Sequence, residues 1–348
     1  MRILLTADAE LPVPPILYGG IERIIDLMAG EFVAAGHSVA LVAHPESTSS
    51  ATAMFPWPGK TSTRPSDQWR NARALRDAVE TFQPDVIHSF SRLLWLASLA
   101  MDRRPKLMSY QREPTGRTVR WSNLLHRGRL KFTGCSEYIC RQGRLGGGGK
   151  WSAIPNAVDL NRYEFRPRVA ANAPLVFLSR IEPIKGCHTA IEIAKRSGRR
   201  LLIAGTHSEE GTLGEYWRQV IEPEVGRNGI EHVGPVNDTE KSVLLGQAAA
   251  MVVPIEWDEP FGIVFIEALA CGTPVIACAL GALPEIIRNG VDGFLVSGAL
   301  EGCTAVERVS ELNRTACRRR AETVFSGPVV AKQYLALYDE MRQSTAKR

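Results

Sequence analysis

Short apolar runs alternate with segments of helical periodicity along most of this sequence. Arg2–Thr6, Val39–Ala43 and Asp85–His88 have the pattern of buried strands, and the apolar residues between positions 21 and 32 recur at helical spacing. Strands that alternate with helices form parallel sheets, because a parallel pair needs a crossover connection that covers one face of the sheet. The pattern therefore predicts an α/β fold of the doubly wound type.

The alternation is interrupted once, by a polar stretch at residues 160–173. A second series of apolar runs starts at Leu175–Ser179, and residues 328–342 again have helical periodicity. A chain of 348 residues has room for about two domains. We predict two Rossmann-like domains and a terminal segment, at residues 1–165, 166–327 and 328–348. Ligands of doubly wound sheets bind at the carboxyl ends of the strands, so we expect both sheets to face a cleft.

Composition and missing motifs exclude several classes of protein. Hydrophobic residues make up 45% and charged residues 23% of the chain, which is typical of a globular protein. No apolar stretch reaches the roughly 18 residues of a membrane-spanning helix, and MRILLTADAE lacks the apolar run of a secretory signal, so we expect a cytoplasmic protein. The seven cysteines have no C-x-x-C spacing, and D-x-D and H-E-x-x-H do not occur. We therefore expect reduced thiols, no metal site and no cofactor.

Positive charge is concentrated in one segment of the first predicted domain. Arg103–Lys150 contains 12 basic and 2 acidic residues, whereas the formal net charge of the whole chain is +5. Such a segment suits an anionic or lipid-linked acceptor or an anionic membrane surface, and a solvated basic face is the alternative. Peripheral contact with the inner membrane face therefore stays open. No nucleic-acid-binding signature accompanies the segment, so we expect no nucleic acid partner.

Two glutamates flank the start of a short apolar helix in the second predicted domain. Glu259 precedes Gly262, where the helix begins, and seven residues separate it from Glu267, which lies among apolar side chains. The first amides of a helix suit a phosphate or a sugar hydroxyl. A carboxylate inside an apolar helix must be paired, and the vicinal hydroxyls of a ribose are a suitable partner. An acidic loop and a helix with one internal ion pair are the alternative.

The stretch Asp258–Val275 closely resembles the E-x7-E signature of the retaining glycosyltransferases of family 4, and the resemblance continues through Leu280–Val296. It implies the two-domain GT-B fold, in which the C-terminal helix crosses back onto the first domain. By this resemblance, Glu259 contacts hydroxyls of the donor sugar and Glu267 contacts the ribose of the nucleotide. The other donor-binding residues that it implies here are Phe261, Gly262, Ile263 and Val264.

Two further sites match the same family. Arg180 and Lys185, which have four residues between them after a buried strand, place two cations where an anion is needed, and a pair of surface cations is the alternative. In the loop Tyr18–Glu22, Gly19 and Gly20 allow a backbone to approach a ligand closely, although a plain Gly-rich turn explains them equally well. The resemblance implies that Arg180 and Lys185 contact the leaving phosphates. It also implies that the Gly19–Gly20 loop reaches across the cleft to the donor phosphate.

Weaker signals concern the nucleobase and the acceptor. Ile230–Asp238 resembles the segment that holds the nucleobase, with Val236 as the backbone contact. His88 ends a strand that faces the cleft, and a structural role is its alternative. Where many family members have a histidine after the next strand, this chain has Gln111 and Arg112, so acceptor recognition departs from the family pattern.

The sequence is thus identified as that of a metal-independent, retaining glycosyltransferase that takes a sugar from a nucleotide-diphosphate sugar, with a UDP-sugar favoured. Arg180 and Lys185 would stabilise charge on the leaving group, and the departing phosphate would take the proton of the acceptor hydroxyl. Two other functions stay open: a sugar-nucleotide epimerase on the same fold and a nucleotide-sugar-binding protein without catalysis. Turnover with an acceptor, or slow hydrolysis of the donor, separates an enzyme from a binding protein.

Overall fold

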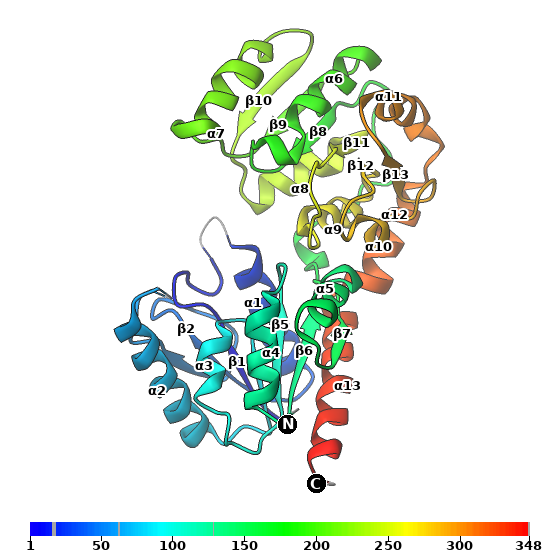
Figure 1. Ribbon diagram of the computed structural model, residues 1–348. Helices are drawn as coiled ribbons and strands as arrows, with labels where there is room; N and C mark the ends of the chain where they lie inside the picture. The colour runs from blue at the N-terminus through cyan, green and yellow to red at the C-terminus, as the bar shows by residue number, and fades with distance from the viewer. Residues whose placement is uncertain (16–18, 62, 128, 347–348) are drawn as a thin grey trace. The chain divides into compact units, whose positions relative to one another are not determined.

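The structure is a computed structural model that describes residues 1–15, 19–61, 63–127 and 129–346. It consists of two compact units (Figure 1). Unit 1 comprises Met1–Ala157 and Gly327–Arg348, and unit 2 comprises Val158–Ser326. Residues 158–165, which are predicted from the sequence to belong to the first domain, belong to unit 2 in this division. The predicted boundaries of independently folding domains, after residues 165 and 327, remain a prediction.

Unit 1 is built on a parallel sheet of seven strands in the order β3-β2-β1-β4-β5-β6-β7. The strands are β1 (Arg2–Thr6), β2 (Ser38–Ala43), β3 (Ala53–Pro56), β4 (Val86–Ser89), β5 (Lys106–Tyr110), β6 (Leu130–Gly134) and β7 (Trp151–Ala153). Its helices are α1 (Gly20–Ala34), α2 (Pro65–Phe82), α3 (Leu93–Ala97), α4 (Gly116–Leu125), α5 (Glu137–Gly147) and α13 (Gly327–Ala346). The strand order reverses between β1 and β4, which makes this the switch point of the sheet.

The helices of unit 1 form two layers. Right-handed crossovers place α1 on one face and α2 to α5 on the other, because the strand order changes direction after β3. α2, α3 and α4 contact one another in a row along the sheet (Figure 1), and α13 packs against α1. The C-terminal helix is therefore part of unit 1.

A buried polar network joins α13 to the sheet of unit 1. His88 on β4 is fully buried, and its ring nitrogens lie 2.6 Å from the Tyr338 hydroxyl and 2.6 Å from the Ser109 hydroxyl. Ser109 is also 2.5 Å from the Thr133 hydroxyl. Burial lowers the pKa of His88 to about 3, so the ring is neutral at pH 7. The geometry gives His88 a structural role, which is to hold α13 on the sheet.

The buried neutral state of His88 predicts a loss of stability in acid. The pKa of His88 is about 3 in the folded chain and about 6.5 when unfolded, so below pH 6.5 only the unfolded state gains the proton. Stability is therefore retained above pH 6.5 and decreases as the pH falls toward 3. We compare the folding constant of the wild type with that of His88→Gln. We expect the ratio of the two constants to be about tenfold smaller at pH 5.5 than at pH 7.5. Urea unfolding of both proteins at these two pH values measures this, and an unchanged ratio would contradict it.

Unit 2 repeats the architecture with a parallel sheet of six strands in the order β10-β9-β8-β11-β12-β13. The strands are β8 (Leu175–Leu178), β9 (Leu201–Ala204), β10 (Ile230–Gly234), β11 (Ala250–Val253), β12 (Val275–Cys278) and β13 (Gly293–Val296). Its helices are α6 (Cys187–Ser197), α7 (Gly211–Tyr216), α8 (Asp238–Gln247), α9 (Ile263–Ala270), α10 (Leu283–Ile286), α11 (Ala299–Arg308) and α12 (Arg314–Arg320). The strand order reverses between β8 and β11, whose carboxyl ends lead into the loops of the predicted donor residues.

Candidate functional site

An ion pair at the switch point of unit 2 joins two of the predicted site residues. Lys185 lies in a short 3₁₀ turn after β8, and Glu259 lies in the loop after β11. The Lys185 Nζ atom is 2.6 Å from Glu259 Oε2, and both side chains are largely buried. Trp257 donates its indole N–H to the same oxygen over 2.9 Å, and the Lys185 ammonium lies 4.6 Å from the Trp257 ring centroid. Two loops that are 74 residues apart in the chain thus form one charged centre.

Close backbone packing fixes the position of Glu259. Its carbonyl accepts the Ala282 N–H over 2.8 Å, and a Cβ atom at Gly281 would lie 2.3 Å from that carbonyl oxygen. Gly262, the residue before α9, has a φ of 79°, and a Cβ atom there would lie 2.4 Å from the Phe265 ring. Only glycine satisfies both the backbone conformation and the space at position 262. A Cβ atom at Gly262 would also lie 3.3 Å from Glu259 Cγ, so the Glu259 side chain lies beside the residue that precedes α9.

Glu267 on α9 is buried and paired, as its apolar surroundings require. Its Oε1 atom accepts the Tyr163 hydroxyl over 2.5 Å and lies 2.6 Å from Lys241 Nζ. Lys241 comes from α8 and also lies 3.4 Å from Asp238. Both contacts go to Oε1, so among the described residues Oε2 has no hydrogen-bond partner and can accept from a ligand hydroxyl.

Arg180 and Val236 lie outside these two networks. The Arg180 side chain is 48% exposed and pairs with Glu182 over 2.5 Å, rather than with the Lys185–Glu259 centre. A phosphate that contacts Arg180 therefore has to compete with Glu182. Val236 is half-buried in the loop between β10 and α8, two residues after Gly234. Asn237 caps α8 in a capping box with Glu240, which fixes the end of this loop.

In unit 1, the predicted glycine loop leads directly into α1. Gly19 precedes the helix with a φ of 148°, and Gly20 is its first residue. A Cβ atom at Gly19 would lie 2.7 Å from Pro15 and 2.8 Å from Glu22 Oε2, so the Glu22 carboxylate folds back against the glycine. Burial raises the pKa of Glu22 above its ordinary value. Tyr18, which belongs to the same sequence motif, lies outside the described residues.

Unit 1 also contains a cavity of about 640 Å³ at the carboxyl ends of β1, β4 and β5. Gln111 and Arg112 line it, as does Glu22. His88 is not among its described lining residues, because the side chain points into the core toward α13. Of the three acceptor-side residues predicted from the sequence, the structure therefore brings two to one cavity.

Two family models match successive parts of the chain. Residues 18–162 match the model described as Glycosyltransferase Family 4, and residues 167–313 match the one described as Glycosyl transferases group 1. The second match contains the whole segment from Arg180 to Glu267. The chain belongs to glycosyltransferase family 4.

Curated relatives of this family 4 chain include the D-inositol 3-phosphate glycosyltransferases of Mycobacterium tuberculosis and Mycobacterium bovis. They are 35% identical over 152 residues, which is 40% of this chain and 32% of the relative. The match therefore spans about a third of the length of these relatives.

Solved structures show the same fold over nearly the whole chain. AviGT4, a glycosyltransferase involved in avilamycin A biosynthesis, has a TM-score of 0.71 at 23% identity, with 98% of each chain covered. A glycosyltransferase from Rickettsia africae reaches 0.77 at 19% identity, also with 98% of each chain covered. Anabaena HepE in complex with UDP and glucose reaches 0.73 at 19% identity, with 97% of this chain and 99% of HepE covered. The predicted GT-B fold with two parallel α/β domains is confirmed.

The site contains three residues that were not predicted from the sequence. Trp257, Tyr163 and Lys241 contact the predicted glutamates directly. Trp257 stands two residues before Glu259, so its proximity is visible in the sequence. Tyr163 and Lys241 lie 104 and 26 residues from Glu267, and no periodic pattern links them to it.

Neither metal ligands nor a membrane helix is visible in the part of the chain that the structure describes. No group of three or more His, Cys, Asp or Glu side chains in these residues could hold a metal ion. No helix among them is long and apolar enough to cross a bilayer.

Proposed function

We propose that this family 4 chain is a metal-independent, retaining glycosyltransferase that moves a sugar from a nucleotide-diphosphate sugar to an acceptor hydroxyl. The observation that carries the proposal is the centre formed by Lys185, Glu259 and the start of α9 at the switch point of unit 2. A cation, a carboxylate and free helix amides at one place suit a sugar diphosphate. The ammonium and the amides would bind phosphate, and the carboxylate would bind sugar hydroxyls.

The donor would be held from its sugar to its base along unit 2. Arg180 and Lys185 contact the phosphates, Glu259 contacts sugar hydroxyls, and Glu267 Oε2 accepts from the ribose. The backbone of Phe261, Gly262, Ile263 and Val264 supports the sugar and phosphate, and Val236 contacts the base. A UDP-sugar is favoured, since HepE, which shares the fold, has been solved with UDP and with UDP-glucose.

The reaction needs no side chain as a general base. The oxygen of the acceptor hydroxyl forms a bond to the anomeric carbon on the face from which the nucleotide leaves. The bond between that carbon and the phosphate oxygen breaks, and its electron pair goes to the phosphate. The departing phosphate then takes the hydroxyl proton. Lys185 and Arg180 stabilise the negative charge that develops on the phosphate, which is an effect typically worth 10²- to 10³-fold in rate per donor.

A ligand screen followed by product analysis tests the proposal. We expect UDP-glucose or another UDP-sugar to raise the melting temperature more than the GDP-, ADP- and dTDP-sugars do, since a ligand of the folded state stabilises it. Turnover should persist in EDTA, and NMR should show that the product keeps the anomeric configuration of the donor. An inverted product, or complete loss of activity in EDTA, would contradict the proposal. Binding of the donor without any transfer or hydrolysis would identify a binding protein instead.

A further inference from the structure

The cavity in unit 1 is large enough for a whole small molecule. Its volume of about 640 Å³ lies within the range of ordinary ligand sites. It opens at the carboxyl ends of β1 and β4, the switch point of this sheet, where ligands of doubly wound sheets bind. All the residues that line it belong to unit 1.

One side of the cavity is an apolar wall formed by α3 and α4, which lie side by side (Figure 1). Leu94 of α3 and Trp121 and Leu125 of α4 line it. These three large side chains are 61%, 63% and 49% exposed, so water covers about half or more of each. Apolar side chains that gather around a cavity in this way mark a binding surface more often than a solvated one. An apolar body placed between the two helices would cover them.

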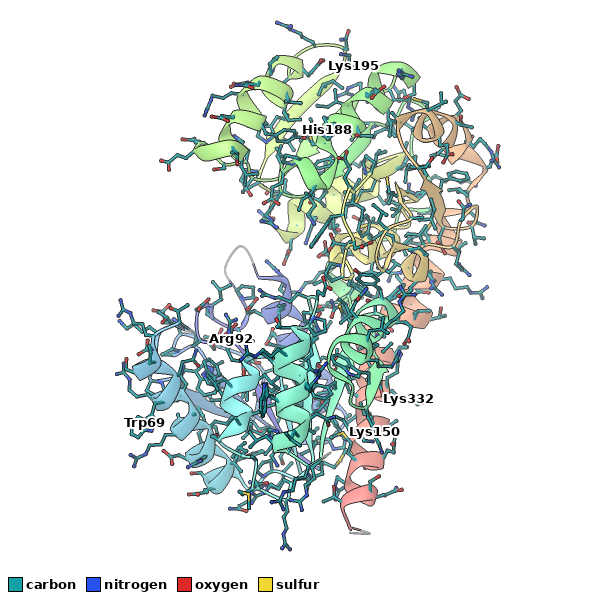
Figure 2. The ribbon with its side chains drawn as sticks, in the orientation of Figure 1. Trp69, Arg92, Lys150, His188, Lys195 and Lys332 are labelled. Carbon is teal, nitrogen blue, oxygen red and sulfur yellow. The ribbon has the colours of Figure 1, made fainter. Side chains whose placement is uncertain are left out.

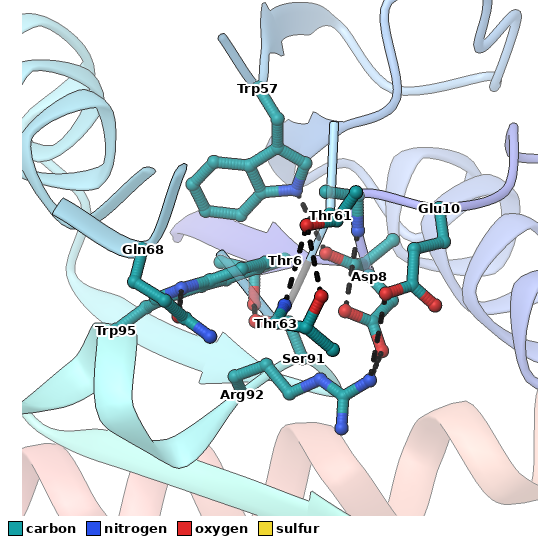
Figure 3. A network of polar contacts seen from close by, with 12 residues as sticks. Thr6, Asp8, Glu10, Trp57, Thr61, Thr63, Gln68, Ser91, Arg92 and Trp95 are labelled. Carbon is teal, nitrogen blue, oxygen red and sulfur yellow. Dashed lines mark hydrogen bonds and ion pairs between the residues drawn. The ribbon is translucent and has the colours of Figure 1, made fainter. Parts of the chain in front are cut away.

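The other side of the cavity, at the strand ends, is polar. Asp8, Glu22 and Ser91 line it there. The Arg92 guanidinium lies 3.3 Å from Asp8 and 4.0 Å from Glu10. Figure 3 shows these three side chains together. Its Nε atom is buried and has no hydrogen-bond partner among the described residues. The Arg92 side chain as a whole is 41% exposed, so a ligand hydroxyl can accept from its guanidinium and donate to a neighbouring carboxylate, and a hydroxyl fits the site better than a purely apolar group.

The charges around the cavity balance, which argues against an anionic ligand. Among the described residues, its charged lining consists of three carboxylates and three guanidinium groups, namely Asp8, Glu22, Glu113, Arg92, Arg112 and Arg117. Of the basic residues in the segment Arg103–Lys150, Arg112 and Arg117 are the ones described as lining the cavity. Lys131 and Arg144 form ion pairs with Glu340 and Glu137, and Lys106 is fully buried.

We infer that this cavity binds an acceptor that joins an uncharged, hydroxyl-bearing head to an apolar body, either an alkyl chain or an aromatic ring. The head lies at the strand ends near Arg92 and Glu22, and the body lies between α3 and α4 against Trp121 and Leu125. That the bound molecule serves as an acceptor rests on the proposed function. The shape and polarity of the bound molecule are inferred from the cavity alone.

Binding of simple glucosides by the full chain tests the inference. Octyl β-glucoside below its micellar concentration supplies an alkyl body, phenyl β-glucoside supplies an aromatic one, and glucose supplies the head alone. We expect at least one glucoside to bind ten times more tightly than glucose, because the apolar body leaves water. The compound that binds more tightly identifies the body as a chain or a ring.

Two pairs of variants locate the binding. Trp121→Ala and Leu125→Ala each remove a lining side chain, and we expect each to weaken glucoside binding about tenfold. Trp69→Ala and Leu124→Ala are matched controls, since Trp69 is 66% and Leu124 69% exposed and neither is among the described lining residues. Trp69 extends from α2 at the edge of unit 1 (Figure 2). All four side chains are exposed, so we expect the variants to fold, and melting curves check this.

Three results would overturn the inference. The glucosides could bind no more tightly than glucose, or the lining variants could bind glucosides as tightly as their controls do. Alternatively, Trp121→Ala could weaken the binding of phosphatidylglycerol vesicles and leave glucoside binding unchanged. The last result would assign the apolar side chains to a membrane surface. Slow hydrolysis of UDP-glucose in the absence of acceptor tests separately whether the protein binds and cleaves the donor. Hydrolysis without glucoside binding refutes the inference alone, whereas glucoside binding without any donor binding or hydrolysis refutes the proposed function alone.

Discussion

Replacement of Lys185 by alanine is expected to lower kcat by about 10²-fold or more. The effect on the folding constant is expected to be smaller. The ammonium is the one cation among the described residues that the structure places directly on Glu259, at 2.6 Å. When the donor binds, its diphosphate would share this ammonium, and the charge on the phosphate increases as the bond to the sugar breaks. A cation that meets more charge in the transition state than in the ground state accelerates the reaction, so its loss affects kcat more than KM. Initial rates at saturating UDP-sugar measure the effect.

The controls for Lys185 separate catalysis from structure. Lys195→Ala removes another lysine of the same unit, on α6, that is ion-paired with Glu224 over 2.8 Å and extends to solvent (Figure 2). We expect it to change kcat by less than twofold, since exposed ion pairs contribute little. Lys185→Ala also leaves Glu259 without its cation, so Glu259→Gln in the same background tests whether that unpaired carboxylate causes the loss. A kcat within fivefold of wild type for folded Lys185→Ala would exclude a role at the phosphate.

Local sequence patterns correctly predict several elements of the fold. The elements that were not predicted depend on tertiary packing. The apolar run at Arg2–Thr6 coincides with β1, and the run at Val39–Ala43 matches β2 to within one residue. By contrast, α5 is not among the predicted elements, because glycine has low helix propensity and three glycines lie in its last half. The packing explains them: a Cβ atom would lie 2.2 Å from the Trp151 ring at Gly143 and 2.4 Å from Val119 at Gly147. Tertiary contacts of this kind override local propensity and cannot be deduced from it.

The residues of the candidate site were predictable from the sequence, but the contacts that these residues make with one another were not. The spacing of Glu259 and Glu267 indicates a loop and a helix, and the need to pair a buried carboxylate at position 267 is confirmed by its contacts. The identity of the partners depends on which distant side chains the fold brings to α9. Lys185 was predicted from its position after a strand, whereas its contact with Glu259 requires the adjacency of β8 and β11. That adjacency is a property of the sheet order.

Glu267→Gln is expected to weaken the binding of free UDP by about 10- to 100-fold. We propose that Oε2 of the carboxylate accepts from the ribose hydroxyls, and hydrogen bonds to a charged acceptor are about twice as strong as neutral ones. Glutamine keeps the shape of the side chain and an oxygen that can face Tyr163, so the structure of α9 should be retained. Calorimetric titration with UDP, which lacks the sugar, measures the ribose and phosphate contacts directly.

A loss of affinity through structural damage must be separated from the loss of a contact. Glu267 also pairs with the largely buried Lys241, and removal of its charge leaves that ammonium with only the longer contact to Asp238. Asp292→Asn is the matched control: Asp292 is fully buried in the same unit and its carboxylate pairs with Arg288 over 2.6 Å, not with a residue of α9. Both variants should lower the urea midpoint, but only Glu267→Gln should weaken UDP binding. If Glu267→Gln binds UDP within twofold of wild type, or if Asp292→Asn weakens binding equally, Glu267 acts through folding and the ribose contact is excluded.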